Sequence, residues 1–120
     1  MKARSRTFYH ITTIDRHANI LRTGGIDPKY STGVRHYSWY VTWAKVPWAI
    51  LHILQRHRVR LSDCVVLRVT APRDVFCFSG RKGVYRASTI LLPSGHYKAE
   101  TLLYRALFRG GDDVNKTASL

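Results

Sequence analysis

The stretch from residue 64 to residue 92 contains three β-rich runs, and it constrains the fold more than any other part of the chain. Cys64–Thr70, with the sequence CVVLRVT, has the composition of a buried strand. Pro72 predicts a turn, after which Val75–Phe78 and Val84–Leu92 predict two further strands. We therefore expect a sheet over residues 64–92, which excludes an all-helical protein.

The N-terminal segment predicts a strand, a helix and a glycine turn. A β-prone run begins at Thr7, the threonine pair at 12 and 13 offers N-caps, and the glycine pair at 24 and 25 offers a C-terminal stop. Residues spaced i, i+4, i+7 form one apolar stripe, which predicts the buried face of the helix: Ile14, Ala18 and Leu21.

The remaining segments add helices and an aromatic strand. Residues 37–43 are rich in aromatic and β-branched side chains and predict a strand, whereas residues 44–55 and 98–108 have helical periodicity. At 120 residues the chain fits one domain of ordinary size. We expect a single α+β domain over residues 1–110, with a flexible C-terminal tail over 111–120.

The charge balance predicts an anionic partner. Twenty Lys and Arg residues against seven Asp and Glu give a formal net charge of +13, and phosphate backbones are common partners of such proteins. Nucleic acid, either RNA or DNA, is therefore the expected partner. The alternative is that the charge reflects only solubility or an unusual host. The sequence leaves the oligomeric state open.

Two further features bear on the compartment and on metal binding. The chain has no apolar segment approaching 18 residues and no apolar region near its N-terminus, so we expect a cytoplasmic protein without a membrane partner. Cys64 and Cys77 lack the spacing of zinc ligands, and we expect two buried thiols and no metal.

The scarcity of carboxylates excludes several classes of enzyme. Glu100 is the only glutamate, and most aspartates occupy cap or turn positions, so paired-carboxylate hydrolysis and two-metal nuclease chemistry are poorly supported. The chain also lacks the glycine-rich phosphate-binding motifs of nucleoside triphosphatases. The remaining Arg, His, Tyr and Thr groups suit phosphate binding and the stabilisation of developing charge.

Three candidate site residues follow from local pattern, each with a purely structural alternative. His10 lies just before a helix N-terminus, where it is either a ligand contact or a core histidine bonded to backbone. Arg35 is either a bidentate phosphate ligand or a solvated loop residue. Tyr40 and the three tryptophans offer stacking surfaces or core packing. Alternation places Trp39 and Tyr40 on opposite faces of their strand, so only one of these faces can line a site.

Four segments in order resemble the RNA 2′-phosphotransferases, whose catalytic lobe has the ADP-ribosyltransferase fold. YHITTIDRHANILRTGGIDP is similar to the family's opening, VRHYSWYVT to its R-HVHL strand, CVVLRVTAPRDVF to its PVVLEVDA strand, and FSGRKGVYRASTILLPSGHY to its close. The resemblance covers about residues 8–97. It implies an ADP-ribosyltransferase-like split β-sheet with flanking helices.

The resemblance also implies NAD as co-substrate and assigns residue roles. His10 and Thr12 would contact the adenosine ribose of NAD, Arg35 would bind a phosphate at the reacting end, and Tyr40 or its neighbours would wall the nicotinamide. Arg81 would supply a second phosphate-binding arginine. The catalytic candidates are thus His10, Arg35 and Arg81, and the cofactor-binding candidates are His10, Thr12 and Tyr40.

Three functions remain open from the sequence. The first is an NAD-dependent ADP-ribosyl- or phospho-transferase acting on nucleic acid. The second is a catalytically inactive module of the same fold that binds nucleic acid or nucleotide, because residues 82–84 (KGV) occupy the place of the wider fold's catalytic glutamate and the family's LRH motif is missing. The third is a small basic interaction protein of a mobile element or defence system.

Overall fold

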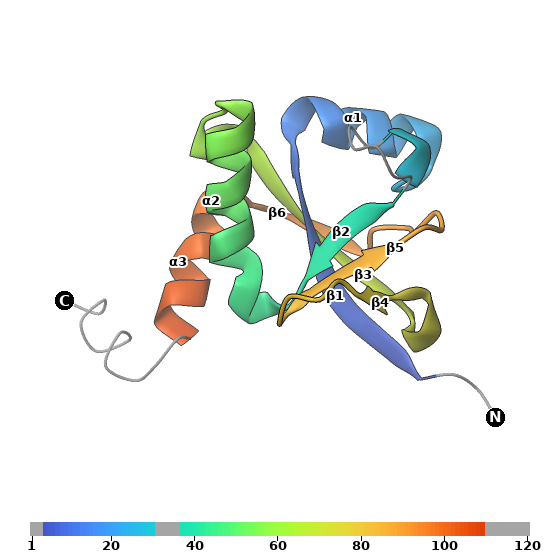
Figure 1. Cartoon of the computed structure of the whole chain (residues 1–120). Helices are drawn as coiled ribbons and strands as arrows, with labels where there is room; N and C mark the ends of the chain where they lie inside the picture. Colours follow the sequence, from blue (N-terminus) through green and yellow to red (C-terminus); the bar gives the residue numbers. More distant parts are fainter. Residues whose placement is uncertain (1–3, 31–36, 110–120) are drawn as a thin grey trace.

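The computed structural model describes residues 4–30 and 37–109, which form one sheet flanked by helices (Figure 1). The strands are β1 (Ser5–Thr13), β2 (Ser38–Val41), β3 (Cys64–Pro72), β4 (Cys77–Phe78), β5 (Val84–Ala87) and β6 (Gly95–Lys98). The helices are α1 (Ile14–Thr23), α2 (Val46–His57) and α3 (Ala99–Arg109), with short 3₁₀ turns at Pro28–Tyr30, Trp43–Lys45, Leu61–Asp63 and Arg73–Val75. The α+β class expected from the sequence is therefore confirmed.

The six strands form one antiparallel sheet in the order β4-β5-β2-β1-β3-β6. β1 and β3 pair along their whole length, from Ser5 opposite Pro72 to Thr13 opposite Cys64. β1 and β2 are also neighbours, but Tyr9 opposite Val41 is the single residue pair between them. The sheet consequently consists of two halves that separate beyond this pair.

The two faces of the sheet bury two hydrophobic clusters. Side chains alternate along β3, so that Leu67 packs in the cluster containing Ile20 of α1, and Val66 packs in the cluster of α2 and α3. Burial on both faces explains why the β3 sequence is an almost continuous apolar run. Figure 1 shows α2 and α3 side by side, with α1 apart from them.

Several predicted helix boundaries agree with the structure. The hydroxyl of Thr13 accepts a hydrogen bond from the backbone N–H of Arg16, and Gly24 ends α1 in the left-handed conformation with φ 86°. Pro47 lies in the first turn of α2, where its missing N–H costs no helical hydrogen bond. The predicted helices over 44–55 and 98–108 correspond to α2 and α3.

Four predictions about local structure were wrong. The strand expected over Val84–Leu92 ends at Ala87, and β6 was not predicted. Cys77 is exposed, because it lies on the short edge strand β4, whereas Cys64 is buried as expected. The stripe of Ile14, Ala18 and Leu21 faces solvent, and Ile20 is the buried residue of α1. Periodicity identified the helix, but it did not identify the side that faces the protein.

Two other expectations concern the chain as a whole. The tail predicted over residues 111–120 lies outside the described residues. Within residues 4–30 and 37–109, no helix combines the length and the apolar character needed to cross a bilayer.

Candidate functional site

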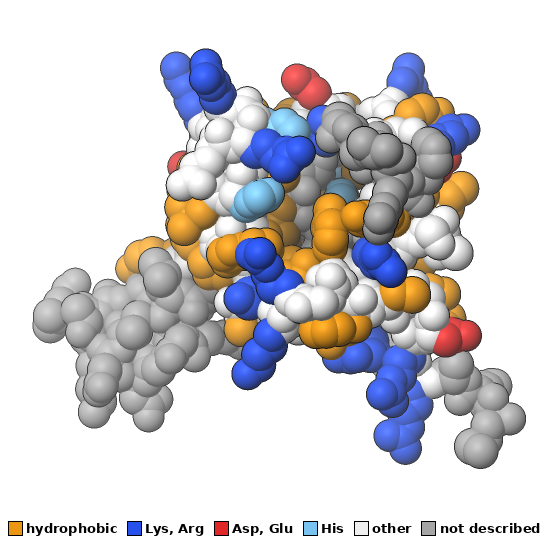
Figure 2. Space-filling model, in the orientation of Figure 1, with side chains coloured by type: hydrophobic (Ala, Val, Ile, Leu, Met, Phe, Trp, Pro, Cys, Tyr) orange, Lys and Arg blue, Asp and Glu red, His pale blue; other side chains and the backbone are white. Residues whose placement is uncertain are grey.

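A cavity of about 600 Å³ opens between α1, α2 and the two halves of the sheet. Its walls include β1, the inward side of α1, one side of α2 and the turn between β4 and β5. Figure 2 shows the hollow in this face of the molecule, with hydrophobic and histidine side chains at its edges and Lys and Arg side chains around it. The volume is within the range of small-molecule binding sites.

The cavity lies where β1 and β2 separate. Continuing their antiparallel register past Tyr9 and Val41 would place His10 near Tyr40 and Thr12 near Ser38, yet these pairs do not form. Consecutive residues of β1, Tyr9 to Thr12, all line the cavity, although they alternate between the two sides of the strand. The gap in the ladder therefore exposes both sides of β1 to a ligand.

The His10 side chain bridges this gap. Its Nδ1 lies 2.8 Å from the carbonyl oxygen of Trp39, and because a carbonyl can only accept, Nδ1–H is the donor. The neutral ring then keeps the lone pair on Nε2. Burial lowers the pKa of His10, the hydrogen bond to Trp39 partly offsets this, and nearby Arg16 lowers the pKa further. Because the ordinary value is already 6.5, His10 is neutral at pH 7.

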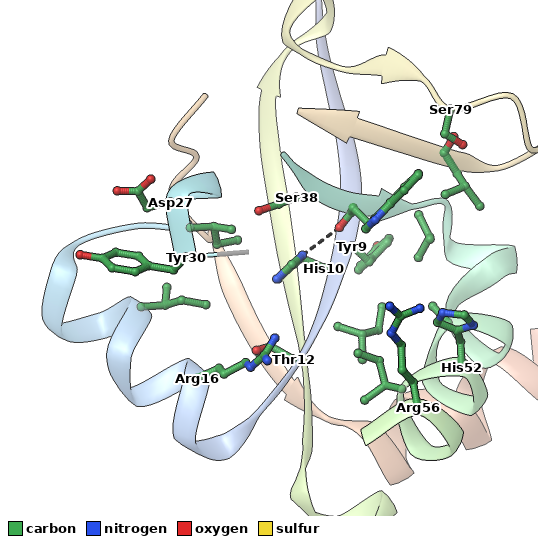
Figure 3. A pocket seen from close by; sticks show the side chains of 18 of the residues that line it. Tyr9, His10, Thr12, Arg16, Asp27, Tyr30, Ser38, His52, Arg56 and Ser79 are labelled. Carbon is green, nitrogen blue, oxygen red and sulfur yellow. Dashed lines mark hydrogen bonds between the residues drawn. The ribbon is translucent and has the colours of Figure 1, made fainter. Parts of the chain in front are cut away.

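Three arginines line the cavity from three different elements. Arg16 comes from α1, Arg56 from the last turn of α2, and Arg81 from the turn before β5. In Figure 3, Arg16 and Arg56 stand on opposite sides of the space beside His10. Within the described residues, the one ion pair is between Lys29 and Asp27, so no acidic side chain there neutralises these three guanidinium groups.

One side of α2 presents a stripe of aromatic and basic groups to the cavity. Trp48, His52 and Arg56 follow one another at four-residue spacing, and the Trp48 and His52 rings are stacked with centroids 5.6 Å apart. The guanidinium carbon of Arg81 lies 5.1 Å from the Trp48 ring, and Lys45 Nζ lies 5.5 Å from it. The cation–π contact with Trp48 places Arg81 next to α2 in the cavity wall.

The inward side of α1 is mostly polar. Arg16, Asn19, Ile20 and Thr23, spaced i, i+3, i+4, i+7, line the cavity. An amphipathic helix ordinarily turns its apolar side inward, whereas α1 exposes Ile14 and Leu21. The polar side of α1 therefore lines a solvent-filled space and contributes one residue, Ile20, to the core.

Carboxylates are scarce around the cavity. Asp27 is the single acidic residue among the lining residues, and its Oδ2 lies 3.6 Å from Lys29 Nζ. No group of three or more potential metal ligands occurs in the described part of the chain. The chemistry offered by the lining residues is thus that of arginine, imidazole, hydroxyl and aromatic groups.

The cavity brings together three of the five predicted site residues. His10, Thr12 and Arg81 all line it, although they are far apart in sequence. Thr12 is buried and Arg81 is exposed at its rim. Arg35 lies within residues 31–36, outside the described residues.

Of the residues predicted to wall the nicotinamide, Tyr40 or its neighbours, Trp39 lines the cavity, whereas Tyr40 does not. It is completely buried in the core, with its ring 5.5 Å from that of Phe76, and burial raises its pKa. Alternation along β2 is the reason, since Tyr40 points to one face and Trp39 to the other. Trp39 lines the cavity and is 45% exposed. The face of β2 that bears Trp39 is therefore the one that a ligand could reach.

Sequence reasoning missed three cavity residues that lie on helices. Arg16, His52 and Arg56 did not stand out because charged residues on helices are usually solvated. The four-residue spacing of Trp48, His52 and Arg56 was the available signal, since it places an aromatic ring and two basic groups on one side of α2.

Comparisons with family models, with curated proteins and with solved structures return no match to this chain. The function is therefore inferred from the geometry of the cavity and from the residues that form it.

Proposed function

We propose that the cavity binds a nucleotide through its phosphates and that the protein is an NAD-dependent transferase of the ADP-ribosyltransferase-like class acting on nucleic acid. The observation that carries the proposal is the convergence of Arg16, Arg56 and Arg81 on a cavity that also contains His10. Each arginine lacks an acidic partner among the described residues.

The three guanidinium groups suit a pyrophosphate. Guanidinium groups form charge-assisted and often bidentate hydrogen bonds with phosphate oxygens. Because Arg16, Arg56 and Arg81 come from separate elements, an anionic ligand between them would contact α1, α2 and the β4–β5 turn together. Binding of such a ligand would offset the mutual repulsion of the three cations.

The remaining lining groups suit the sugar and ring portions of a nucleotide. His10 Nε2 can accept a hydrogen bond from a ribose hydroxyl while Nδ1–H is held by Trp39. Trp39 and Trp48 provide ring faces at separate places on the wall. The single β1–β2 pair also agrees with the split sheet that the resemblance implies, in which the dinucleotide enters between the first strand and the aromatic strand.

The transfer step requires little acid–base chemistry from the protein. The bond between ribose and nicotinamide would break, nicotinamide would leave with the bonding electron pair, and an anionic phosphate oxygen of the acceptor would supply the new pair to the ribose carbon. A base nitrogen as acceptor would in addition release its proton to solvent. A phosphate acceptor is already anionic, so arginines that position it and stabilise charge are sufficient. This agrees with the described part of the wall, which holds three arginines and no glutamate.

A binding module without catalysis is the second candidate. The scarcity of carboxylates in the cavity wall favours it. Asp27 is the one acidic side chain in the cavity wall, and it is paired with Lys29. Glutamate-assisted transfer therefore has no residue in the described part of the wall. Under this alternative, the same arginines and rings bind nucleotide or nucleic acid without cleaving a bond.

Two measurements separate these functions. Calorimetric titration with NAD, ADP and adenosine tests the site, and we expect NAD and ADP to bind at least about tenfold more tightly than adenosine because the phosphates carry the affinity. Chromatographic detection of nicotinamide after incubation with NAD and RNA or DNA tests transfer. Tight binding without nicotinamide release supports the binding module, and equal affinities for ADP and adenosine contradict both functions.

We predict that Arg56→Gln and Arg81→Gln each weaken ADP binding by about tenfold, since each removes charge-assisted hydrogen bonds to phosphate. Arg105→Gln on α3 removes the same charge from an exposed position outside the cavity and serves as the matched control. Equal losses in all three variants would indicate general electrostatic attraction instead of a phosphate site.

A further inference from the structure

Beside the cavity, a small group of aromatic and basic side chains lies on β2, on β5 and on the residue that precedes β2. The group consists of Tyr37, Trp39 and Arg86, and we call it the strip. Trp39 and Arg86 are directly opposite each other in the β2–β5 ladder, so their side chains share one face of the sheet. The Tyr37 and Trp39 ring centroids are 5.0 Å apart, and the guanidinium carbon of Arg86 lies 5.5 Å from the Tyr37 ring.

The strip is continuous with the cavity. Val41 and Val84, the next opposite pair on the same face, line the cavity, and so does Trp39. Two residues of strand span about 7 Å. Trp39 therefore stands at the edge of the cavity, and Tyr37 and Arg86, which do not line it, extend the same surface outward.

The strip has features that packing within the chain does not explain. Trp39 is 45% exposed, although it is a large apolar ring on an interior strand of the sheet. At this position β2 is paired with β5, and β1 has already separated from it. Arg86 has no acidic partner among the described residues. The Tyr37 and Trp39 rings meet edge to face, with an interplanar angle of 81°, and Arg86 lies over the Tyr37 ring. Two rings with separate exposed surfaces, beside a guanidinium group that has no acidic partner, can stack unpaired bases and contact a backbone phosphate.

We propose that the strip binds single-stranded nucleic acid, with bases stacked on Tyr37 and Trp39 and a backbone phosphate bound by Arg86. This inference rests on the proposed function in one respect, since it identifies the acceptor as single-stranded and leads it to the cavity edge at Trp39. Single strands fit because their base faces are free to stack, whereas a duplex covers them. The net charge of +13 favours a polyanion of either sugar type.

The test is fluorescence anisotropy with labelled ten-nucleotide single strands, without NAD. Tyr37→Ala should weaken binding at least about fivefold through loss of one stacking ring, and Arg86→Gln should weaken it by about fivefold through loss of a phosphate contact. An abasic strand with the same number of phosphates should bind the wild-type protein at least about fivefold more weakly than the normal strand. ADP binding should be unchanged in both variants, because neither residue lines the cavity.

Matched variants exclude indirect effects. Tyr37→Phe keeps the ring and should bind as the wild type does, whereas Arg105→Gln removes an equal charge from α3 and should have little effect on the affinity. Circular dichroism and thermal unfolding of Tyr37→Ala identify any loss of fold, in which case the abasic comparison on the wild-type protein decides.

Three results would overturn the proposal: equal binding of abasic and normal strands, tighter binding of a duplex, or affinities unaffected by Tyr37→Ala and Arg86→Gln. Binding to anionic lipid vesicles that competes with the strand for these residues would point to a membrane surface. If ADP fails to bind while the strip variants lose affinity for single strands, the proposed function fails and the strip remains supported. The opposite pattern refutes the strip alone.

Discussion

Where β1 and β2 separate, the His10 imidazole supplies a hydrogen-bond donor in place of a backbone N–H. Its Nδ1–H donates to the Trp39 carbonyl over 2.8 Å, which a strand partner would otherwise satisfy through the ladder. The side chain thereby links the two strands beyond their single ladder pair. The structural and functional interpretations of His10 thus coincide, because the hydrogen bond that satisfies Nδ1 also fixes which nitrogen carries the lone pair.

The buried position of His10 predicts a dependence of stability on pH. Its folded pKa is lowered from 6.5, so below about pH 6.5 the unfolded chain binds a proton that the folded chain does not. The free energy of unfolding should therefore fall as the pH falls below about 6.5. Urea unfolding between pH 5 and 8 should show a smaller fall for His10→Gln, by at most about 1.4 kcal/mol per pH unit, the contribution of one proton.

Two other histidines also make the free energy of unfolding fall as the pH falls. The contribution of His10 must therefore be isolated by comparing the wild-type protein with His10→Gln. Burial is the main cause that lowers the pKa of both His17 and His57. Their contributions are common to the wild-type protein and His10→Gln, so they cancel in the difference between the two curves. Parallel curves would show that folded His10 binds its proton as readily as the unfolded residue does.

At the residue level, the sequence was informative where the chemistry of a side chain is unusual for its local context. His10 was singled out by its position before a helix N-terminus and Thr12 by the resemblance, and both line the cavity. Tyr40 was assigned to a ligand although alternation left two faces open, and the packing of the sheet decided between them. Arg16 and Arg56 could not be identified, because whether a helical arginine faces solvent or a cavity depends on helix placement.

At the level of elements, α1 shows how a site can determine the orientation of a helix. Its ends follow from local chemistry, the Thr13 cap and the Gly24 terminus, and both were predictable. Its rotation was not predictable, because the apolar residues Ile14 and Leu21 face outward while Arg16 faces the cavity. Helix limits depend on neighbouring residues along the chain, whereas helix orientation depends on what the rest of the fold leaves unfilled.

The terminus of α1 supports a prediction about stability. Gly24 has φ 86°, and a Cβ built on it would meet no atom within 4 Å. Gly24→Ala should therefore destabilise the protein through backbone strain alone, by about 1 kcal/mol, and Gly24→Asn by less, because asparagine tolerates the left-handed region better. Urea unfolding measures both variants, and equal stabilities for the glycine and alanine proteins would contradict the strain argument.

The extent of β5 and the presence of β6 likewise depend on the rest of the fold and not on their own sequences. Val84 to Leu92 has the composition of one long strand, but the ladder with β2 ends at Ala87, and Leu91 instead forms an isolated bridge with Ile26. β6 contains Gly95 and alternates half-buried and exposed residues, so it lacks the apolar signal of a strand. It forms because β3 has a free edge, which is a property of the assembled sheet and not of the segment.

For the whole molecule, the excess of positive charge and the arginines of the cavity both favour an anionic ligand. Acidic side chains are few throughout the sequence, and the described part of the chain has one ion pair. Repulsion between the cations around the cavity is therefore incompletely compensated in the free protein. An anionic ligand, as proposed, would relieve this repulsion, and the wide distribution of positive charge would attract such a ligand to the protein.

The distribution of charge gives a quantitative expectation for single-stranded nucleic acid. A strand that crosses the strip and enters the cavity would meet four arginines, namely Arg16, Arg56, Arg81 and Arg86. Neutralising about four phosphates of a single strand should give a slope near −3 for the logarithm of affinity against the logarithm of salt concentration, or about a 50-fold loss between 50 and 200 mM salt. Anisotropy titrations across this range measure the slope.

Arg86→Gln should reduce the magnitude of this slope by about 0.7, and Arg105→Gln on α3 should leave it unchanged. A flat dependence would rule out a phosphate backbone as the partner, and equal changes in the two variants would mean that the positive charge acts diffusely, without a defined path across β2 and β5.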